Sequence, residues 1–246
     1  MPDATAIKTA VVVGGTGGLG SGVTEALAGR NMRVVTLSRS APLDGAPVPG
    51  AAEHIVGNAA EESTAARVLD EIRPDLIVLC AGVQPLLRPI HLHTWETFAE
   101  AWEVDAKSAF VWLRNALLLP VKSGTHIIVV SSAAAIQGSP LSGGYAGAKR
   151  TQWLIAKYAA LEVARLKLGI RIHCLLPVLT PNGIGQAAMK AYAARAGVSV
   201  EEFANRFSPP VTPALMGQAV LDLHDDPAKA NQLAWQLDGR GLTALP

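Results

Sequence analysis

The sequence has few cysteines and few aromatic residues, and neither sign of charge is in excess. Its 246 residues include two cysteines, and 5% of them are Phe, Trp or Tyr. Two thiols are too few for a disulfide-dense scaffold, and no metal-type cysteine spacing is present. A formal net charge of +1 without a basic tract disfavours a nucleic-acid partner. His91 and His93 stand two residues apart without a Cys or carboxylate cluster nearby, so we expect a polar loop there and no metal site.

Long apolar runs are also missing. No segment approaches about 18 uninterrupted apolar residues, so we expect no membrane-spanning helix. The first 15 residues lack a basic start followed by an apolar stretch, so no signal peptide is expected and a cytoplasmic location is predicted. Half of the residues are hydrophobic, enough for a large core. Cys80 and Cys174 each lie within an apolar run and are expected to be buried, reduced thiols.

Short apolar runs rich in β-branched residues recur along the chain, and helical patterns follow most of them. The runs cover residues 10–15, 33–39, 53–58, 75–82, 125–132 and 170–177, and residues 231–246 could supply a seventh strand. Such runs are typical of strands buried on both faces of a parallel sheet. We therefore expect one α/β domain over residues 1–246. It should be a single-domain Rossmann fold, with a doubly wound, mostly parallel seven-stranded sheet and helices on both faces.

The regular alternation ends after Pro177. Residues 180–213 contain several prolines and glycines and two short helical patterns. Insertions at the carboxyl edge of a sheet often cover a ligand, so this segment is expected to cover a substrate. For residues 192–207 within it, a plain surface helix remains the alternative to a lid.

A glycine-rich loop, VVVGGTGGLGSG, joins the first predicted strand to the first predicted helix. Glycines permit a tight turn and a close backbone approach to a pyrophosphate, and a helix N-terminus adds N–H groups. The run fits G-x-G-x-x-G through Gly15, Gly17 and Gly20. It also fits G-x-x-x-G-x-G through Gly14, Gly18 and Gly20. Its position predicts a dinucleotide site without choosing a subfamily, and a merely flexible turn is the alternative.

The second apolar run ends at Ser38 and Arg39, about 20 residues beyond the glycines. A carboxylate at this place would bind the ribose 2′-hydroxyl of NAD, whereas an arginine suits the 2′-phosphate of NADP. Arg39 therefore predicts that NADP(H) is favoured over NAD(H). The alternative is a solvated surface arginine.

A candidate proton-transfer site lies in the segment SSAAAIQGSPLSGGYAGAK. Tyr145 and Lys149 are four residues apart, so on a helix they share one face. A nearby ammonium favours the phenolate, which makes Tyr145 a usable acid or base near neutral pH. Ser132, at the end of an apolar run, could hydrogen-bond a carbonyl oxygen as charge develops on it. The alternatives are that Ser132 is a turn hydroxyl, Tyr145 a core aromatic ring and Lys149 a surface charge.

With these motifs the sequence resembles the short-chain dehydrogenase/reductase family, in its shorter single-domain branch. The resemblance covers roughly residues 7–180 and is carried by GGTGGLG, CAG at 80–82, VDAKSAF at 104–110, Ser132, YAGAK and Pro177. It implies that Tyr145 is the catalytic acid/base. It also implies that Lys149 assists Tyr145 and binds the nicotinamide ribose, and that Ser132 orients the substrate oxygen. A homotetramer or homodimer formed through long helices near residues 94–118 and 145–167 is implied as well.

The chain departs from the family pattern in several places and resembles a divergent member. Asp105 stands where the family usually has Asn. That asparagine supports a water relay to the lysine, mainly through its backbone carbonyl, so Asp105 can still serve, while its carboxylate shifts local pKa values. Val178 replaces the glycine that usually follows Pro177. Asn58 stands where an acidic residue often contacts adenine.

The predicted site follows from the resemblance and from position along the chain. Ser132, Tyr145, Lys149 and Asp105 are the predicted catalytic residues. The predicted cofactor contacts are Gly14, Thr16, Gly17, Gly18, Leu19, Gly20, Ser38, Arg39, Asn58, Ala81, Gly82, Tyr145, Lys149, Pro177, Val178 and Thr180. Gln137, Leu141, Leu179, Met189 and Tyr192 are expected to form the substrate pocket.

These residues predict an NADP(H)-dependent oxidoreductase. It would transfer a hydride between nicotinamide and a carbonyl or alcohol carbon, with Tyr145 moving the proton. Alanine, leucine and methionine around the predicted pocket favour a small or medium apolar ketone, aldehyde or alcohol. Two alternatives stay open: an NADPH-binding sensor or scaffold without turnover, and an epimerase or dehydratase of the same fold.

Overall fold

A computed structural model describes residues 7–42, 46–119, 121–181 and 183–246. The strands are β1 (Thr9–Val13), β2 (Arg33–Ser38), β3 (Glu53–Val56), β4 (Leu76–Leu79), β5 (His126–Val130), β6 (Arg171–Pro177), β7 (Ala234–Asp238) and β8 (Gly241–Leu245). The α-helices are α1 (Gly18–Gly29), α2 (Glu62–Ile72), α3 (Trp95–Ala101), α4 (Lys107–Leu118), α5 (Ala134–Gln137), α6 (Tyr145–Leu166), α7 (Ile184–Ala196), α8 (Val200–Asn205) and α9 (Pro213–Asp225). A π-helical turn, η3 (Trp102–Ala106), joins α3 to α4, and η2 (Ile90–Leu92) and η4 (Pro227–Lys229) are short 3₁₀ turns.

The strands form one sheet in the order β3-β2-β1-β4-β5-β6-β7-β8. Neighbouring strands are parallel except β7 and β8, so the predicted doubly wound, mostly parallel sheet is confirmed. The predicted strand count of seven is wrong by one. The C-terminal segment turns at Gly239 and Arg240 and returns antiparallel, with Trp235 beside Ala244. Strand order reverses between β1 and β4, the position where doubly wound sheets bind ligands.

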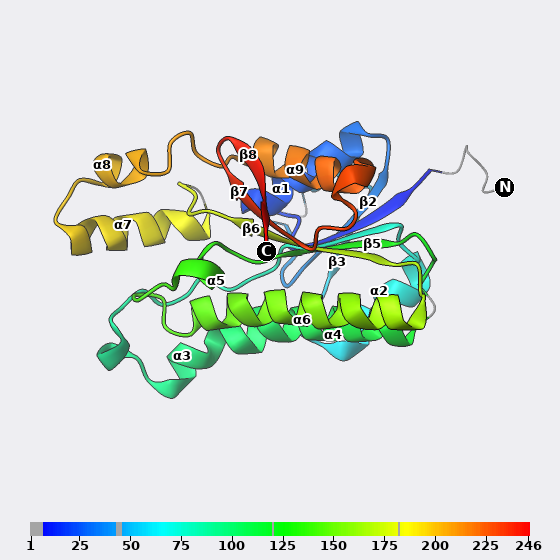
Figure 1. Cartoon of the computed structure of the whole chain (residues 1–246), viewed down its shortest axis with the longest axis horizontal. Helices are drawn as coiled ribbons and strands as arrows, with labels where there is room; N and C mark the ends of the chain where they lie inside the picture. The colour runs from blue at the N-terminus through cyan, green and yellow to red at the C-terminus, as the bar shows by residue number, and fades with distance from the viewer. Residues whose placement is uncertain (1–6, 43–45, 120, 182) are drawn as a thin grey trace.

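Helices cover both faces of the sheet. Helices α2, α4 and α6 lie on one face, and α1 and α9 lie on the other (Figure 1). Alternate residues of a strand point to opposite faces. Val11 and Val13 accordingly belong to the core under α4 and α6, whereas Ala10 and Val12 belong to the core under α1 and α9. Burial on both sides explains why these strands are uniformly apolar in sequence.

Two glycines let α1 and α9 meet backbone to backbone. A Cβ placed on Gly22 would lie 1.9 Å from the carbonyl oxygen of Pro213. A Cβ on Gly217 would lie 2.3 Å from the carbonyl oxygen of Gly22. Neither position can accept a larger residue without separating the helices. Because α1 carries the glycine loop at its start, this contact also fixes one wall of the site.

The long helix expected near residues 94–118 is interrupted. Thr94 caps α3, since its side chain accepts a hydrogen bond from the N–H of Thr97. The π-helical turn η3 then separates α3 from α4. A wide turn of this kind adds a residue to the helical repeat and is frequent at functional sites. Asp105 lies in this turn and is completely buried.

The tryptophans of this region have different environments. Trp112 of α4 is buried and its indole N–H donates to the carbonyl oxygen of Ala59 at 3.0 Å. Trp95 is 74% exposed and stacks on Phe98. Trp102, 40% exposed, packs over Gly144 at the start of α6. Of these three rings, Trp112 alone belongs to the core, because the other two lie on the outer surface of α3 and η3.

Helices α7 and α8 extend beyond the carboxyl edge of the sheet (Figure 1). Among the described residues, no helix has the length and apolar character needed to cross a bilayer.

Three histidines form a hydrogen-bonded chain between β5, β6 and α9. His126 Nε2 lies 2.7 Å from His173 Nδ1, and His126 Nδ1 lies 3.2 Å from His224 Nδ1. His173 Nε2 lies 3.0 Å from the carbonyl oxygen of Lys229, which can only accept, so this nitrogen carries the proton. It follows that His126 donates to His173 and that His224 donates to His126. The chain is fully satisfied when all three rings are neutral.

Burial is the main cause that lowers the pKa of each of these histidines below the ordinary value of 6.5, most strongly for His126. The unfolded chain therefore binds more protons than the folded one, and stability should fall as the pH drops below about 6.5. For His126 the expected slope is about 1.4 kcal/mol per pH unit until the folded ring titrates. Urea unfolding between about pH 8 and pH 5 measures it.

The variant His126→Leu should show a shallower dependence of unfolding free energy on pH than the wild type. His91→Asn, which changes an exposed histidine, is the matched control and should keep the wild-type slope. Equal slopes in His126→Leu and wild type would contradict the assignment of acid lability to the chain of three rings.

Candidate active site

A cavity of about 1000 Å³ lies at the carboxyl ends of the strands. The loops after β1, β2, β4, β5 and β6 contribute to it, as expected where the strand order reverses. All of the predicted cofactor contacts line it: Gly14, Thr16, Gly17, Gly18, Leu19, Gly20, Ser38, Arg39, Asn58, Ala81, Gly82, Tyr145, Lys149, Pro177, Val178 and Thr180. Ser132 lines it too, whereas Asp105 lies behind the wall.

The glycine loop approaches β4 closely. Gly14 has a φ of +82°, and a Cβ on it would lie 2.7 Å from the backbone nitrogen of Ala81. A Cβ on Gly20 would lie 2.1 Å from the carbonyl oxygen of Gly14. Gly17 and Gly18 face open space, whereas Gly15 packs inward and does not line the cavity. The spacing through Gly14, Gly18 and Gly20 is therefore the one that faces the cavity.

The start of α1 fits a pyrophosphate. The helix begins after Gly17 without a side-chain cap, so its first N–H groups are left to a ligand. An anion at a helix N-terminus is stabilised by these donors and by the helix dipole. The absence of Cβ atoms at Gly17 and Gly18 leaves room for a phosphate beside the backbone.

Polar residues after β2 and β3 border the other end of the cavity. Arg39 is exposed and, within the part of the chain that the structure describes, makes no hydrogen bond or ion pair. Ser38 Oγ donates to the carbonyl oxygen of Ser40 at 2.8 Å. Asn58 Oδ1 accepts from the N–H of Ala60 at 3.0 Å, and its Nδ2 donates to Glu61 Oε1 at 3.3 Å.

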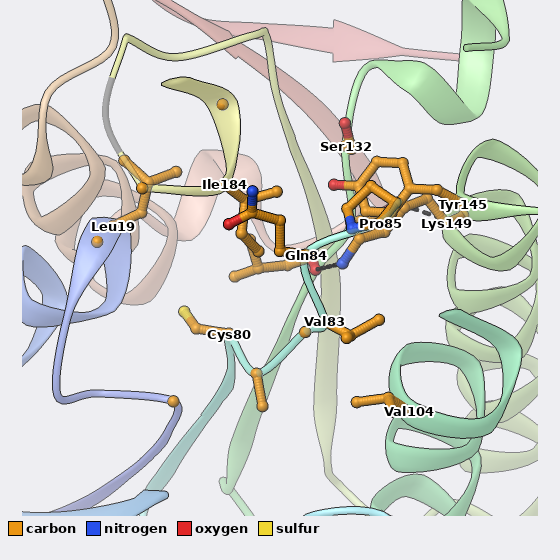
Figure 2. Close-up of a pocket in the computed structure, with 18 of the residues that line it drawn as sticks. Leu19, Cys80, Val83, Gln84, Pro85, Val104, Ser132, Tyr145, Lys149 and Ile184 are labelled. Atoms are coloured by element: carbon orange, nitrogen blue, oxygen red, sulfur yellow. Dashed lines mark hydrogen bonds between the residues drawn. The ribbon is translucent and has the colours of Figure 1, made fainter. Parts of the chain in front are cut away.

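Ser132, Tyr145 and Lys149 converge at one end of the cavity, although they come from different elements. Ser132 follows β5, and Tyr145 and Lys149 occupy the first two turns of α6. Figure 2 shows the hydroxyls of Ser132 and Tyr145 at the same end, with Leu19 across the cavity. The Lys149 ammonium lies 5.5 Å from the centre of the Tyr145 ring. Ser132 Oγ accepts from the N–H of Ala134 at 3.2 Å, which leaves its own proton for another acceptor.

Behind this end of the cavity, Asp105 and Lys149 form a buried ion pair with Oδ2 and Nζ 3.7 Å apart. Burial raises the pKa of the Asp105 carboxyl above its ordinary 3.8, and the Lys149 charge opposes this rise. Burial lowers the pKa of Lys149, but Asp105 and then Tyr145 outweigh it, so the pKa rises overall from 10.5. A Cβ on Gly82 would lie 2.8 Å from Asp105 Oδ1. The Asp105 carboxylate therefore occupies space that a side chain at position 82 would need.

Three of the five residues predicted for the substrate pocket line the cavity, namely Gln137, Leu179 and Tyr192. Leu141 and Met189 are buried and are not among its lining residues. One face of α7 is turned to the cavity through Ile184, Ala188 and Tyr192, which recur every fourth residue. Met189 is one residue further, about 100° around the helix, and packs into the protein.

Sequence reasoning missed several lining residues. Gln84, Pro85 and Leu87 follow β4 and line the cavity. Position could have revealed them, because the carboxyl ends of parallel strands meet at the same edge. Figure 2 shows Gln84 and Ile184 between Leu19 and Tyr145 in that view.

An aromatic group from the segment 180–213 closes the cavity on one side. Tyr192 stacks on Phe203 with ring centres 6.2 Å apart, and Phe203 lies 5.7 Å from Phe207. The Tyr192 hydroxyl lies 2.7 Å from Ser139 Oγ and accepts from the N–H of Leu141 at 3.1 Å. Sequence reasoning did not single out Phe203 and Phe207, whose spacing of four residues could have indicated this wall.

The two cysteines and the histidine pair have no ligand-like arrangement. Cys174 is buried as expected, but Cys80 is partly exposed and lines the cavity, contrary to expectation. Burial of its sulfur raises the pKa of Cys80 to about 12, so it stays a thiol. His93 lies 3.2 Å from Thr97 Oγ1. Over the described ranges, no group of three His, Cys, Asp or Glu residues could hold a metal ion.

Comparison with known proteins identifies the family. A family model described as "short chain dehydrogenase" matches residues 8–193. The chain belongs to the short-chain dehydrogenase family. A curated relative, D-beta-hydroxybutyrate dehydrogenase of Cupriavidus necator, is 30% identical, with 94% of this chain and 96% of the relative covered. Another, the short chain dehydrogenase/reductase AacuD of Aspergillus aculeatus, is 33% identical over 64% of this chain and 59% of its own length.

Solved structures show the same fold. Levodione reductase superposes with a TM-score of 0.80 at 21% identity, covering 94% of this chain and 96% of its own. NAD+-bound xylitol dehydrogenase superposes with a TM-score of 0.82 at 17% identity. The superposition covers 94% of this chain and 98% of the xylitol dehydrogenase chain. The family resemblance stated from the sequence is confirmed. As a member of this family, the short-chain dehydrogenase described here is an oxidoreductase with a nicotinamide cofactor.

Gly20→Ala should destabilise the protein, because the new Cβ has no room beside the carbonyl of Gly14. Overpacking of this kind typically lowers the free energy of unfolding by about 1–3 kcal/mol. Gly29→Ala, at the other end of α1, is the control: nothing lies within 4 Å of its Cβ position. Chemical denaturation of both variants checks the difference, and equal stabilities would argue against the close loop contact.

Proposed function

We propose that this short-chain dehydrogenase uses NADP(H) and transfers a hydride between nicotinamide and a carbonyl or alcohol carbon, with Tyr145 as acid/base. One observation carries the cofactor choice. Arg39 lies exposed at the end of β2 on the cavity, at the place where a carboxylate would select NAD. An arginine side chain without a protein partner among the described residues is available to bind a 2′-phosphate.

The remaining cofactor contacts follow from the cavity. The N–H groups at the start of α1 would hold the pyrophosphate, and Asn58 would bind the adenine by hydrogen bonding. Lys149 would bind the nicotinamide ribose, and Pro177 and Val178 would flank the nicotinamide ring. The nicotinamide supplies or accepts the hydride when it is bound.

The chain's own residues would move the proton. In reduction, the Tyr145 hydroxyl gives its proton to the substrate oxygen, and in oxidation the phenolate takes it back. The Lys149 ammonium, 5.5 Å from the ring, stabilises the phenolate in the second case. Ser132 donates its hydroxyl proton in a hydrogen bond to the same oxygen, because the N–H of Ala134 already occupies one of its lone pairs.

The proposed substrate is an uncharged, small or medium apolar ketone, aldehyde or alcohol. Within the described part of the chain, the charged residues that line the cavity are Arg39, Glu61, Glu103, Lys107 and Lys149. None of them belongs to segment 180–213, whose lining residues are uncharged and include Tyr192, Phe203 and Phe207. A hydroxy acid, as in the name of one relative, would leave its carboxylate facing this aromatic wall, so we do not favour it.

A homodimer or homotetramer would bury the outer faces of α4 and α6. Phe110 and Leu118 on α4 are 53% and 64% exposed, and Tyr158 and Leu161 on α6 are 60% and 59% exposed. Adjacent exposed apolar side chains of this size mark association surfaces.

Arg39→Ala should weaken NADPH binding about tenfold or more and leave NADH binding unchanged, since a charge-assisted hydrogen bond contributes about 1.5–3 kcal/mol. Titration of the purified protein with each nucleotide measures both dissociation constants. Arg67→Ala, on the surface of α2, is the matched control. A wild-type preference for NADH, or an equal loss for both nucleotides, would reject the NADP(H) assignment.

Tyr145→Phe should lower kcat by about 10²- to 10⁴-fold and leave the nucleotide dissociation constant unchanged, because it removes the proton donor alone. A panel of apolar ketones and aldehydes with NADPH provides the assay, and Tyr158→Phe on the exposed face of α6 is the control. Unchanged turnover in Tyr145→Phe would contradict the acid/base role. Nucleotide binding without turnover would favour a sensor or scaffold, and turnover without net NADPH consumption would favour an epimerase or dehydratase.

A further inference from the structure

The carboxylate of Asp105 has an unusual environment. The residue is fully buried in η3, and its Oδ1 accepts a hydrogen bond from the N–H of Val83 at 2.9 Å. Its Oδ2 makes no hydrogen bond with the described part of the chain. The Lys149 ammonium, 3.7 Å away, is the charge that this oxygen faces. Burial is the largest effect and raises the pKa of this carboxyl, while the Lys149 ammonium and the Val83 N–H oppose the rise and stabilise the ionised form.

The backbone carbonyl of Asp105 is engaged elsewhere. It accepts a hydrogen bond at 2.9 Å from Nε2 of Gln152, a side chain of α6 that is 1% exposed. The sequence suggested that a water relay could reach Lys149 through this carbonyl. The buried amide of Gln152 occupies one of the two lone pairs of this carbonyl oxygen. The carboxylate is the group of Asp105 that forms the ion pair with Lys149.

Lys149 has few other partners to balance its charge. Its Nζ donates to the carbonyl oxygen of Val130 at 3.4 Å and lies beside the Tyr145 ring. Among the described residues, Asp105 is the carboxylate within ion-pair distance of it. At short range in a buried site, the field of an ammonium on a phenol is reduced when a carboxylate lies next to that ammonium.

We propose that Asp105 is a positioning residue that holds Lys149 and raises the pH at which Tyr145 ionises, so that alcohol oxidation, which needs the phenolate, reaches its full rate only at alkaline pH. The proposal rests on the acid/base role of Tyr145 proposed above. In reduction, the substrate carbon receives a hydride from the reduced nicotinamide, and its oxygen receives the Tyr145 proton. The resulting phenolate recovers a proton from solvent. Oxidation requires the Tyr145 phenolate at the start, and a nearby carboxylate disfavours formation of that phenolate.

The other titratable groups near this pair do not substitute for Asp105. Cys80 and Cys174 face Lys149, but burial raises the pKa of each thiol, to about 12 for Cys80, so both stay neutral at pH 7. Glu100 of α3 also acts on Asp105 as a like charge, but its side chain is exposed to solvent, which screens its field.

The proposal is tested on the full chain without cofactor or substrate, by ultraviolet titration of tyrosinate. Subtracting the tyrosinate absorbance of Tyr145→Phe from that of the wild type leaves the signal of Tyr145, without those of Tyr158 and Tyr192. The same difference is measured in the Asp105→Asn background, which keeps the acceptor for the Val83 N–H and removes the charge. We expect Tyr145 to ionise at a pH lower by on the order of one unit in Asp105→Asn. Glu100→Gln, which removes the exposed like charge that acts on Asp105, should leave this pH unchanged.

An unchanged or higher ionisation pH in Asp105→Asn would overturn the proposal. The wild type alone also tests it if that variant does not fold. A Tyr145-dependent tyrosinate signal already present at about pH 7 would contradict a role for Asp105 in keeping the hydroxyl protonated. Because the titration needs no turnover, its failure is distinct from failure of the proposed function, which Tyr145→Phe turnover reports.

A kinetic measurement gives a second readout. In Asp105→Asn the midpoint of the pH–rate profile for alcohol oxidation should move to lower pH by on the order of one unit, because the phenolate forms at lower pH. A variant that merely loosened the fold would lower the rate at every pH and leave this midpoint in place. An unchanged midpoint would therefore also overturn the proposal.

Discussion

The parallel pairing of β1 with both β2 and β4 is the constraint on which the site depends. It brings the carboxyl ends of these strands to one edge, where the strand order reverses. At that edge the β1–α1 loop must pass close to the residues after β4. Gly14 allows this because it has no Cβ to collide with Ala81 and can adopt a positive φ. The cavity, the helix N-terminus beside it and the residues after β5 and β6 all follow from this arrangement.

A second constraint lies behind the cavity, where burial of Lys149 would be costly without a counter-charge. Asp105 supplies that charge from η3, and the N–H of Val83 after β4 holds the carboxylate in place. The ion pair therefore connects the α3–α4 region, α6 and the β4 loop at the point where Tyr145 begins α6. The same contacts that stabilise the fold determine the electric field at the proposed acid/base residue.

Local spacing made part of this predictable from the sequence. Tyr145 and Lys149 share a helical face, and the uniformly apolar runs identify strands buried on both sides. Tertiary contacts decided the rest. The inward face of α7 depends on what it packs against, so Met189 was wrongly expected in the pocket in place of Ile184 and Ala188. The π-helical turn at Asp105 and the antiparallel return of β8 leave no periodicity signal that a sequence pattern could reveal.

If the cavity at the strand reversal binds a nicotinamide dinucleotide with its reacting end at Ser132 and Tyr145, bound NADPH should shield the surrounding segments. Amide hydrogen exchange of the wild-type protein, with and without saturating NADPH, tests this binding most directly. Protection is expected at the β1–α1 loop, at the residues after β4 and β5, and at the first turns of α6. Protection confined to other surfaces, or no protection at any of these segments, would contradict it.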